Sequence, residues 1–429
     1  MKKKPTYFVD LFAGCGGLSL GLENAGFSPV YVNELHPDAM KTYLQNRQDN
    51  HPLLANEKYH SNDIQQSLTQ KKHALDNLTD NFEEDFGIKT GELGLVVGGP
   101  PCQGFSAMGI RRTHSEIQKK DIPSNYLFND MIKTINHLQP KAFVFENVAG
   151  LATGKWSSKG TKGEIYKDLK REFGKIKGYT VKSEIIRAKS YGVPQNRPRI
   201  IMIGIRDEFC PKLDSTLTGS GLLPEPIKSL PPDPIELFSD LVDRNYKKTL
   251  KTENYPSNVK FKIQTYFRKK KDGSVLKKGD KLTEQEYSAH TPKIIKKFQF
   301  MIDNKISLKH IEQKSSIIIP EEFKSKKWSQ KYIPEKWGTA GPTVTATSLP
   351  DDFVHYSQPR SFTVREWARF QMFPDWYEFS GKRTTGGDRR AGKPGDWSRE
   401  LPKYTQIGNA VPVKLAEEIG KHLQNLFKN

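Results

Sequence analysis

Cysteine is scarce in this chain, and long apolar runs are absent from it. The 429 residues contain three cysteines, at positions 15, 102 and 210, an odd and widely spaced set that excludes a disulfide framework. No CxxC pair or cysteine–histidine cluster indicates a zinc site. No stretch approaches the roughly 18 apolar residues of a transmembrane helix, and Asp10 interrupts the first apolar run before signal-peptide length. We therefore expect a cytoplasmic protein with no metal site and no membrane association.

Acidic residues are also few relative to basic ones. Lysine and arginine total 68 and aspartate and glutamate 49, which gives a formal net charge of +19. A balance this basic favours a polyanionic partner, most often nucleic acid, although many basic proteins bind none. The chain is 35% hydrophobic and 10% aromatic, so it can bury a core, and its length predicts two or three domains.

Residues 1–205 alternate short apolar segments with helical ones. Strands are expected at 7–12, 30–32, 93–97, 142–145, 181–186 and 200–205, and helices at 18–25 and 37–46. This alternation predicts an α/β domain, doubly wound, with a mainly parallel sheet and helices on both faces.

The pattern changes at 206–340, where prolines, lysine runs and interleaved aromatic residues replace the alternation. We interpret this segment as a second, basic domain; a lysine-rich solvated insertion is the alternative. Residues 341–429 again show regular secondary-structure patterns. An amphipathic helix is expected to begin near Thr363, and a turn at QIGNAVP precedes a last helix. The end of the chain is therefore expected to complete the first domain.

The stretch VDLFAGCGGLSLGLENAGF, residues 9–27, joins a strand to a helix through a glycine turn. Gly14, Gly16 and Gly17 let backbone N–H groups approach a ligand closely, and the helix N-terminus favours an anionic group. The spacing departs from G-x-G-x-x-G, which argues against a dinucleotide. Glu34 is placed to accept both ribose hydroxyls of a nucleoside, and Asp63 to accept from an adenine amino group. A structural turn without a ligand is the alternative.

The stretch GGPPCQGFS, residues 98–106, places Cys102 in a rigid turn after a buried strand. Ligands of α/β folds bind at the strand ends, and Pro100 and Pro101 hold the sulfur in one direction. Nearby cations would favour the thiolate, which makes Cys102 a candidate nucleophile. A buried structural cysteine is the alternative, and it is the better interpretation of Cys210.

Two further blocks carry charged groups at strand ends. In FENV, residues 145–148, partial desolvation of Glu146 favours its protonated form and suits a proton donor; a helix-capping carboxylate is the alternative. In VPQNRPRIIMIG, Arg197 and Arg199 lie two residues apart on an extended segment and so face the same way. They are suited to hold substrate oxygens and lower the pKa of a thiol, whereas a surface salt bridge is the alternative.

Together and in this order, these blocks resemble the DNA cytosine-5 methyltransferase family of the bacterial restriction–modification type. The resemblance covers most of 7–205 and 340–425 and is carried by DLFAGCGG, GGPPCQGFS, FENV, QNRPR, TVREWARFQMFPD and QIGNAVP. It implies a Rossmann-like, S-adenosylmethionine-dependent methyltransferase domain formed by 1–205 and 341–429. A smaller, basic target-recognition domain at 206–340 is inserted into it.

The resemblance makes Cys102 the nucleophile that attacks C6 of a cytosine flipped out of the duplex, after which C5 takes the methyl group. Glu146 would contact N3 and the exocyclic amine, and protonation at N3 would offset the developing charge. Arg199 would lie near the base oxygen and Cys102, supported by Arg197 and Gln195. The residues expected to bind the DNA substrate are Gln103, Ser106, Gln195, Arg111 and Arg112.

The implied cofactor is S-adenosylmethionine. Its pocket is expected to be formed by Phe12, Ala13, Gly14, Gly16, Gly17, Glu34, Leu35, Asp63, Ile64, Pro100, Leu127, Asn409, Ala410 and Val411. Asn409 to Val411 would return from the far end of the chain to complete the pocket.

The expected partner is double-stranded DNA, with residues 103–125 forming a loop that closes over it. The family implies a cognate restriction endonuclease acting on the same sequence, and one catalytic unit per flipped base favours a monomer. The recognition sequence, the methylated cytosine and the role of the basic segment 376–401 do not follow from these residues.

Three alternatives stay open. A tRNA cytosine-5 methyltransferase shares these motifs, but the large basic domain favours DNA. A non-catalytic DNA-binding relative would be expected to lack the cysteine or the glycine turn, and both are present. A small-molecule methyltransferase leaves the charge and the basic domain unexplained.

Overall fold

A computed structural model of the chain describes residues 5–101, 122–307, 317–323, 330–339, 341–345, 353–384 and 400–428. It divides into two compact units. The first consists of Met1–Tyr191, Arg197–Lys228 and Val411–Asn429, and the second of Gly192–Asn196 and Ser229–Ala410.

Within the described part of the first unit, a seven-stranded sheet has the order β3-β2-β1-β4-β5-β7-β6. Strand β7 is antiparallel to both of its neighbours, and the remaining pairs are parallel. The strands are β1 Thr6–Leu11, β2 Phe27–Asn33, β3 His60–Ser61, β4 Leu95–Gly98, β5 Ala142–Val148, β6 Tyr179–Arg187 and β7 Pro198–Arg206. The predicted doubly wound, mainly parallel fold is confirmed.

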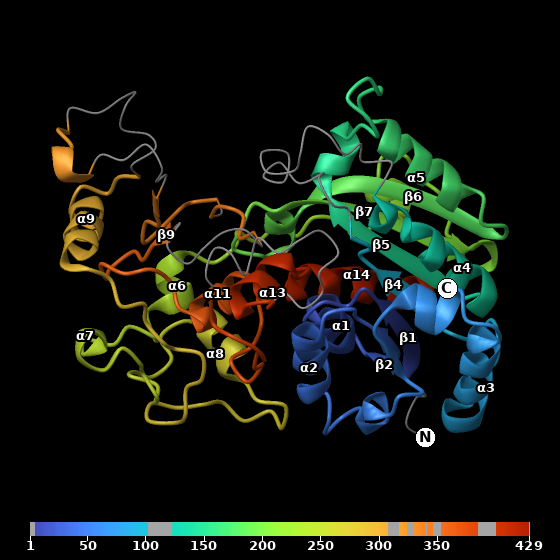
Figure 1. Cartoon of the computed structure of the whole chain (residues 1–429), viewed down its shortest axis with the longest axis horizontal. Coiled ribbons are helices and arrows are strands. Elements are labelled where there is room, and N and C mark those ends of the chain that lie inside the picture. The colour runs from blue at the N-terminus through green and yellow to red at the C-terminus, as the bar shows by residue number, and fades with distance from the viewer. Residues whose placement is uncertain are drawn as a thin grey trace. The chain divides into compact units, whose positions relative to one another are not determined.

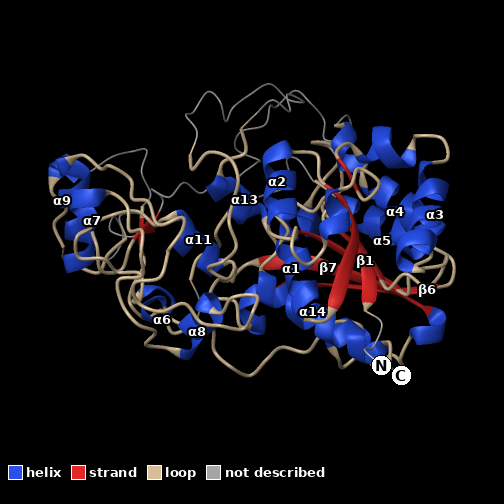
Figure 2. Ribbon diagram, turned by 90° about the horizontal axis from the view of Figure 1, so that it is seen from below, coloured by secondary structure: helices blue, strands red, loops and turns tan. Residues whose placement is uncertain are grey.

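Helices cover both faces of this sheet. They are α1 Gly17–Asn24, α2 Pro37–Gln45, α3 Ala74–Phe86, α4 Phe128–Leu138, α5 Glu164–Gly174 and α14 Val413–Leu426. Figure 2 shows α1 and α14 on one side of the sheet and α3, α4 and α5 on the other. Strands β4 and β5 are therefore buried on both faces, which explains why they are apolar without alternation.

The last helix packs against the first one, and Val411–Asn429 belongs to the first unit, whereas residues 341–410 of the segment predicted to complete that domain do not. A Cβ atom on Gly21 would lie 2.4 Å from the Ala416 Cβ and from the Val413 carbonyl oxygen, and one on Gly420 would lie 2.7 Å from the Ala25 Cβ. Glycine on each helix thus permits an approach that any larger residue would block.

The second unit contains short helices and a parallel pair of two-residue strands. The helices are α6 Pro234–Phe238, α7 Tyr246–Thr249, α8 Lys262–Arg268, α9 Pro292–Asp303, α11 Val364–Phe370 and α13 Lys403–Asn409, and the strands are β8 Lys331–Tyr332 and β9 Phe353–Val354. The structure groups 206–228 with the first unit and 341–410 with the second, which differs from the predicted boundaries at 205 and 340. The assignment of 206–340 to target recognition stays a prediction.

Helix α11 begins as predicted, because Thr363 and Glu366 form a capping box. The Thr363 hydroxyl accepts from the Glu366 N–H, and the Glu366 carboxylate accepts from the Thr363 N–H. The helix is not amphipathic, however: all seven of its residues are buried. Its charges are neutralised inside the unit, where Arg369 pairs with Asp240 and Asp375. This charge pairing allows 353–375 to be part of the second unit's core.

The block QIGNAVP was predicted to be a turn, and its first half is helical instead. Gln406–Asn409 close α13, and the chain leaves the helix at Ala410. The helix forms because Tyr404 and Ile407, one turn apart, are both buried against the second unit. No helix in the described part of the chain is long and apolar enough to cross a membrane.

Candidate active site

The glycine turn after β1 has the open geometry expected of a ligand site. Phe12, Gly14 and Gly16 all have positive φ angles, of 59°, 56° and 86°, and Gly16 leads directly into Gly17, the first residue of α1. The Ala13 N–H donates to the Asn33 carbonyl at 3.0 Å, which ties the turn to the end of β2. A Cβ atom on Gly14 would meet nothing within 4 Å, so the space beside the turn is open.

Glu34 connects the ends of β1 and β2. One carboxylate oxygen accepts from the Gly14 N–H at 2.7 Å and the other from the His36 N–H at 2.8 Å. Burial raises the pKa of Glu34, and these two backbone donors oppose the increase. Leu35, which follows, is half-buried. The predicted ribose-binding carboxylate therefore lies against the glycine turn.

The next predicted pocket residues follow β3 and precede α4. One oxygen of Asp63 accepts from the backbone N–H groups of Gln65 and Gln66, at 2.8 and 3.1 Å, and so begins a short helical turn. Ile64 is buried in the main core, and Leu127 packs against that core at the start of α4. Part of the Asp63 carboxylate thus has a structural use that the sequence did not reveal.

The turn that precedes Cys102 is held against the end of β5. A Cβ atom on Gly98 would lie 2.8 Å from the Leu11 carbonyl oxygen, and one on Gly99 would lie 3.1 Å from Glu146 Oε2. The Asn147 side chain donates from Nδ2 to the Pro100 carbonyl oxygen at 2.9 Å. The GGPP and FENV blocks, far apart in sequence, therefore form one site at the carboxyl edge of the sheet.

Glu146 and Arg199 form a buried ion pair in this site. The Arg199 Nε lies 2.7 Å from Glu146 Oε1, and the two side chains are 10% and 12% exposed. Arg197 is also buried, and burial lowers the pKa of both guanidinium groups while the Glu146 charge opposes the decrease. The salt bridge weighed as an alternative exists for Arg199, but it is buried at the end of β5 and not on the surface.

The remaining predicted residues lie elsewhere or outside the described residues. Gln195 belongs to the second unit, where its amide bonds to the Phe370 carbonyl, to Gln371 and to the Val344 N–H. Asn409 and Ala410 end α13 in the second unit, whereas Val411 begins the last segment of the first. Those outside the described residues are Cys102, Gln103, Ser106, Arg111 and Arg112.

Two residues of the site were missed in the sequence. Asn147 was missed because the sequence shows it only as the residue after Glu146 and gives no sign of its partner. Its side-chain amide donates to the Pro100 carbonyl and so anchors that turn. Asp10 was noted only as an interruption of the first apolar run. It is buried beneath the glycine turn, accepts from the Ser19 hydroxyl and lies near Arg47, which donates to the Gly16 carbonyl. A lone aspartate within an apolar strand is a pattern that could have indicated this role.

Replacing Asn147 by alanine is expected to lower kcat about 10–100-fold, because the turn leading into Cys102 loses its anchor. The variant should also lose about 1–3 kcal/mol of unfolding free energy, since the Pro100 carbonyl and Val148 N–H lose a buried partner. Steady-state methyl transfer and thermal unfolding measure the two effects. Asn136→Ala, an exposed change on α4, is the control. A stability loss with kcat unchanged would contradict a positioning role.

Asp10 is expected to make stability depend on pH. Burial raises its pKa from 3.8 to about 7, against the Ser19 hydrogen bond and the Arg47 charge, which lower it. Between about pH 4 and pH 7 the folded state holds a proton that the unfolded chain has lost, so this contribution to the unfolding free energy falls as pH rises.

Asp10→Asn keeps an acceptor for Ser19 and removes the titration. Its unfolding free energy should therefore decline less than that of the wild type between pH 4 and pH 7, by ~4 kcal/mol at most for a shift of this size. Urea denaturation across this range measures the difference. Parallel profiles for the two proteins would show that Asp10 does not titrate in this window.

Fold and site together define a class of protein: an α/β protein with an open glycine turn and a buried ion pair, both at the carboxyl edge of its mainly parallel sheet. A family model described as C-5 cytosine-specific DNA methylase matches residues 6–425. The chain therefore belongs to this family and is a DNA cytosine-5-methyltransferase of the Type II restriction–modification type.

Individual relatives span nearly the whole chain. Type II methyltransferase M.DdeI of Desulfomicrobium norvegicum is 32% identical over 425 residues, which cover 98% of this chain and 89% of that protein. Type II methyltransferase M1.HphI of Haemophilus parahaemolyticus is 30% identical over 424 residues, covering 98% and 87%. The crystal structure of a prophage-encoded DNA modification methyltransferase from E. coli has a TM-score of 0.64 at 21% identity and covers 99% of each chain, which supports the fold.

Proposed function

We propose that the enzyme transfers a methyl group from S-adenosylmethionine to C5 of a cytosine flipped out of a specific duplex sequence. Methylation at that site would protect DNA in a restriction–modification system. The observation that carries the proposal is the joining of the Glu146–Arg199 pair to the Pro100 turn through Asn147, directly before Cys102.

The residues in this site divide the chemistry between them. The Cys102 thiolate adds to C6 of the cytosine, and electron density moves toward N3 and C5. Glu146 holds or delivers a proton at N3, which neutralises the charge that develops there. Arg199 fixes the carboxyl group of Glu146 through the 2.7 Å contact. In the proposed mechanism, its cationic charge also favours the thiolate form of Cys102. Once C5 carries the methyl group, the C5 proton is lost to water, the Cys102 thiolate is eliminated from C6 and N3 returns its proton to Glu146, which restores the aromatic ring.

The residues around the glycine turn fit S-adenosylmethionine, which supplies the methyl group. The space beside Gly14 is open, and Glu34 lies at the end of β2 where ribose hydroxyls are expected. The two turn bonds both go to one oxygen of Asp63, so the other oxygen is proposed to accept from the adenine amino group.

Double-stranded DNA is the proposed substrate form. The net charge of +19 predicts strong attraction to phosphates, and a target atom inside the base stack requires flipping. A cognate endonuclease, a monomeric enzyme and a cytoplasmic location complete the proposal. The Type II relatives support the endonuclease, and one catalytic site per flipped base supports the monomer. The absence of a disulfide framework in the sequence supports the cytoplasmic location.

Methyl transfer from labelled S-adenosylmethionine to mixed-sequence duplex DNA and to tRNA tests the proposal. We expect 5-methylcytosine in the DNA, confined to one sequence context that mapping of the product would identify. Transfer to tRNA alone would assign the enzyme to the RNA-modifying branch. Binding of DNA without transfer to either substrate would support the non-catalytic alternative.

A further inference from the structure

A lysine-bearing loop follows the strand that carries Glu146. Residues 154–163, the 154–163 loop, join the short helix Ala149–Thr153 to α5. Figure 1 shows this loop in green, projecting from the first unit before α5. Its sequence, GKWSSKGTKG, contains no acidic residue and exposes lysines at positions 155, 159 and 162.

The backbone of the 154–163 loop is fixed by its own hydrogen bonds. The Gly163 N–H donates to the Gly154 carbonyl at 3.1 Å and closes the loop. The Glu164 carboxylate accepts from the N–H groups of Trp156 and Thr161, at 2.5 and 2.9 Å. A Cβ atom on Gly160 would lie 2.0 Å from Glu164 Oε1, so a larger residue there would displace the carboxylate from these bonds. The backbone that carries the three lysines is therefore held in one conformation by these hydrogen bonds.

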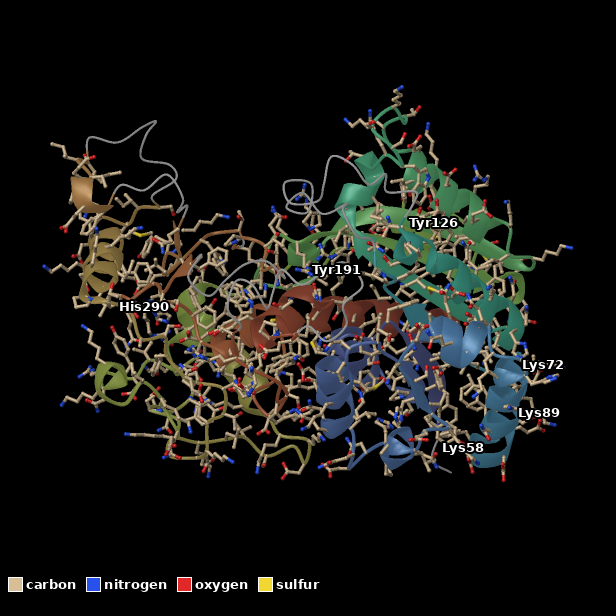
Figure 3. The ribbon with its side chains drawn as sticks, viewed as in Figure 1. Lys58, Lys72, Lys89, Tyr126, Tyr191 and His290 are labelled. Atoms are coloured by element: carbon tan, nitrogen blue, oxygen red, sulfur yellow. The ribbon has the colours of Figure 1, made fainter. Side chains whose placement is uncertain are left out.

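An aromatic pair connects the loop to the residues that precede α4. The Trp156 indole stacks on Tyr126 with ring centroids 5.2 Å apart and planes 3° apart, and its Nε1 donates to Asp168 at 2.7 Å. Tyr126, labelled in Figure 3, is 37% exposed. It ends the short helix Pro123–Tyr126, so the stack holds the loop beside the chain that returns from the region after Cys102.

The lysine charges are not neutralised within the described residues. The nearby carboxylates have other partners: Glu164 binds backbone N–H groups, and Asp168 binds Trp156 and Arg171, the latter at 2.8 Å. No ion pair in the described part of the chain includes Lys155, Lys159 or Lys162. Three exposed cations near the active edge of the sheet will attract phosphate groups.

We propose that the 154–163 loop binds the phosphate backbone of duplex DNA beside the target cytosine. This inference rests on the proposed methyl transfer to DNA and adds a contact surface to it. The lysines supply affinity that does not depend on base sequence, because they meet phosphates and not base edges. The Tyr126–Trp156 stack holds this surface against the short helix Pro123–Tyr126 that precedes α4.

The test compares two triple variants with the same change in charge. Lys155→Gln/Lys159→Gln/Lys162→Gln removes the loop cations. Lys58→Gln/Lys72→Gln/Lys89→Gln removes three other exposed lysines of the same unit, and Figure 3 shows them at the opposite end of the unit from the loop. The dissociation constant for duplex DNA is measured at several salt concentrations. Thermal unfolding and S-adenosylmethionine binding verify that both variants are folded.

We expect the loop variant to bind DNA about 10–100-fold more weakly near 0.1 M salt and to lose about two to three units of the log–log salt slope. Its kcat at saturating DNA should equal that of the wild type. The control variant should lose less than one unit. Equal slopes for the two variants would overturn the inference while leaving methyl transfer by the wild type, and hence the proposed function, intact. A wild type that binds the duplex without methylating it would overturn the proposed function, and the two slopes would still decide the role of the loop.

Discussion

Replacement of Cys102 by alanine is expected to lower kcat for methyl transfer at least about 10³-fold. The physical reason is that C5 of cytosine becomes electron-rich only after a nucleophile has added to C6, and Cys102 is the proposed nucleophile. The turn before it supports this assignment, because Asn147 and the close approach of Gly99 to Glu146 direct the chain into the site.

Cys210→Ala is the matched control for this variant. Cys210 is half-buried, and its thiol donates to the Pro211 carbonyl oxygen at 3.5 Å, in a short turn after β7. We expect its removal to leave kcat unchanged. Single-turnover assays with labelled methyl donor measure both variants, and binding of duplex DNA checks that the Cys102 variant retains its substrate affinity. Transfer by the Cys102 variant at a tenth of the wild-type rate or more would exclude the covalent mechanism.

Replacement of Glu146 by glutamine is expected to lower kcat/KM by about 10²–10⁴-fold, since a neutral amide cannot deliver a proton to N3. It should also destabilise the fold by about 3–5 kcal/mol, because the Arg199 guanidinium stays buried without its carboxylate partner. The two effects have different origins and can be separated by a second substitution.

The double variant Glu146→Gln/Arg199→Gln separates them. Removing both charges should recover part of the unfolding free energy but none of the activity. Glu208→Gln is the control for an ion pair: its contact with Arg206 at 2.9 Å is largely exposed, so its loss should cost less than about 1 kcal/mol and leave kcat/KM unchanged. Recovery of activity together with stability in the double variant would show that Glu146 acts only through folding.

Much of the site could be predicted because its chemistry is local in sequence. Strand ends of a parallel sheet meet at one edge, so DLFAGCGG, GGPP, FENV and the arginine segment were expected to converge, and Glu146 and Arg199 do. The apolar strands, the glycine turn and the cap at Thr363 also depend on neighbouring residues alone. For that reason the sheet elements and the fold class were correct.

Partners far apart in the sequence were not predictable in this way. A buried charge pair of the second unit is an example: Arg369 on α11 pairs with Asp240, 129 residues away, where the sequence pattern indicated a polar helix face. A charged residue has the same appearance in a sequence whether water or a carboxylate surrounds it, and only the folded chain decides which.

The sequence by itself determined the order of the motifs, the doubly wound sheet and the identity of the groups available for chemistry. Only the tertiary structure decided how these groups are held. The Asn147 amide on the Pro100 carbonyl, the Arg47 guanidinium on the Gly16 carbonyl and the α1–α14 contact through Gly21 all join residues distant along the chain. Such contacts depend on distances of a few ångströms between separate elements, which the packing of the core fixes and no local pattern records.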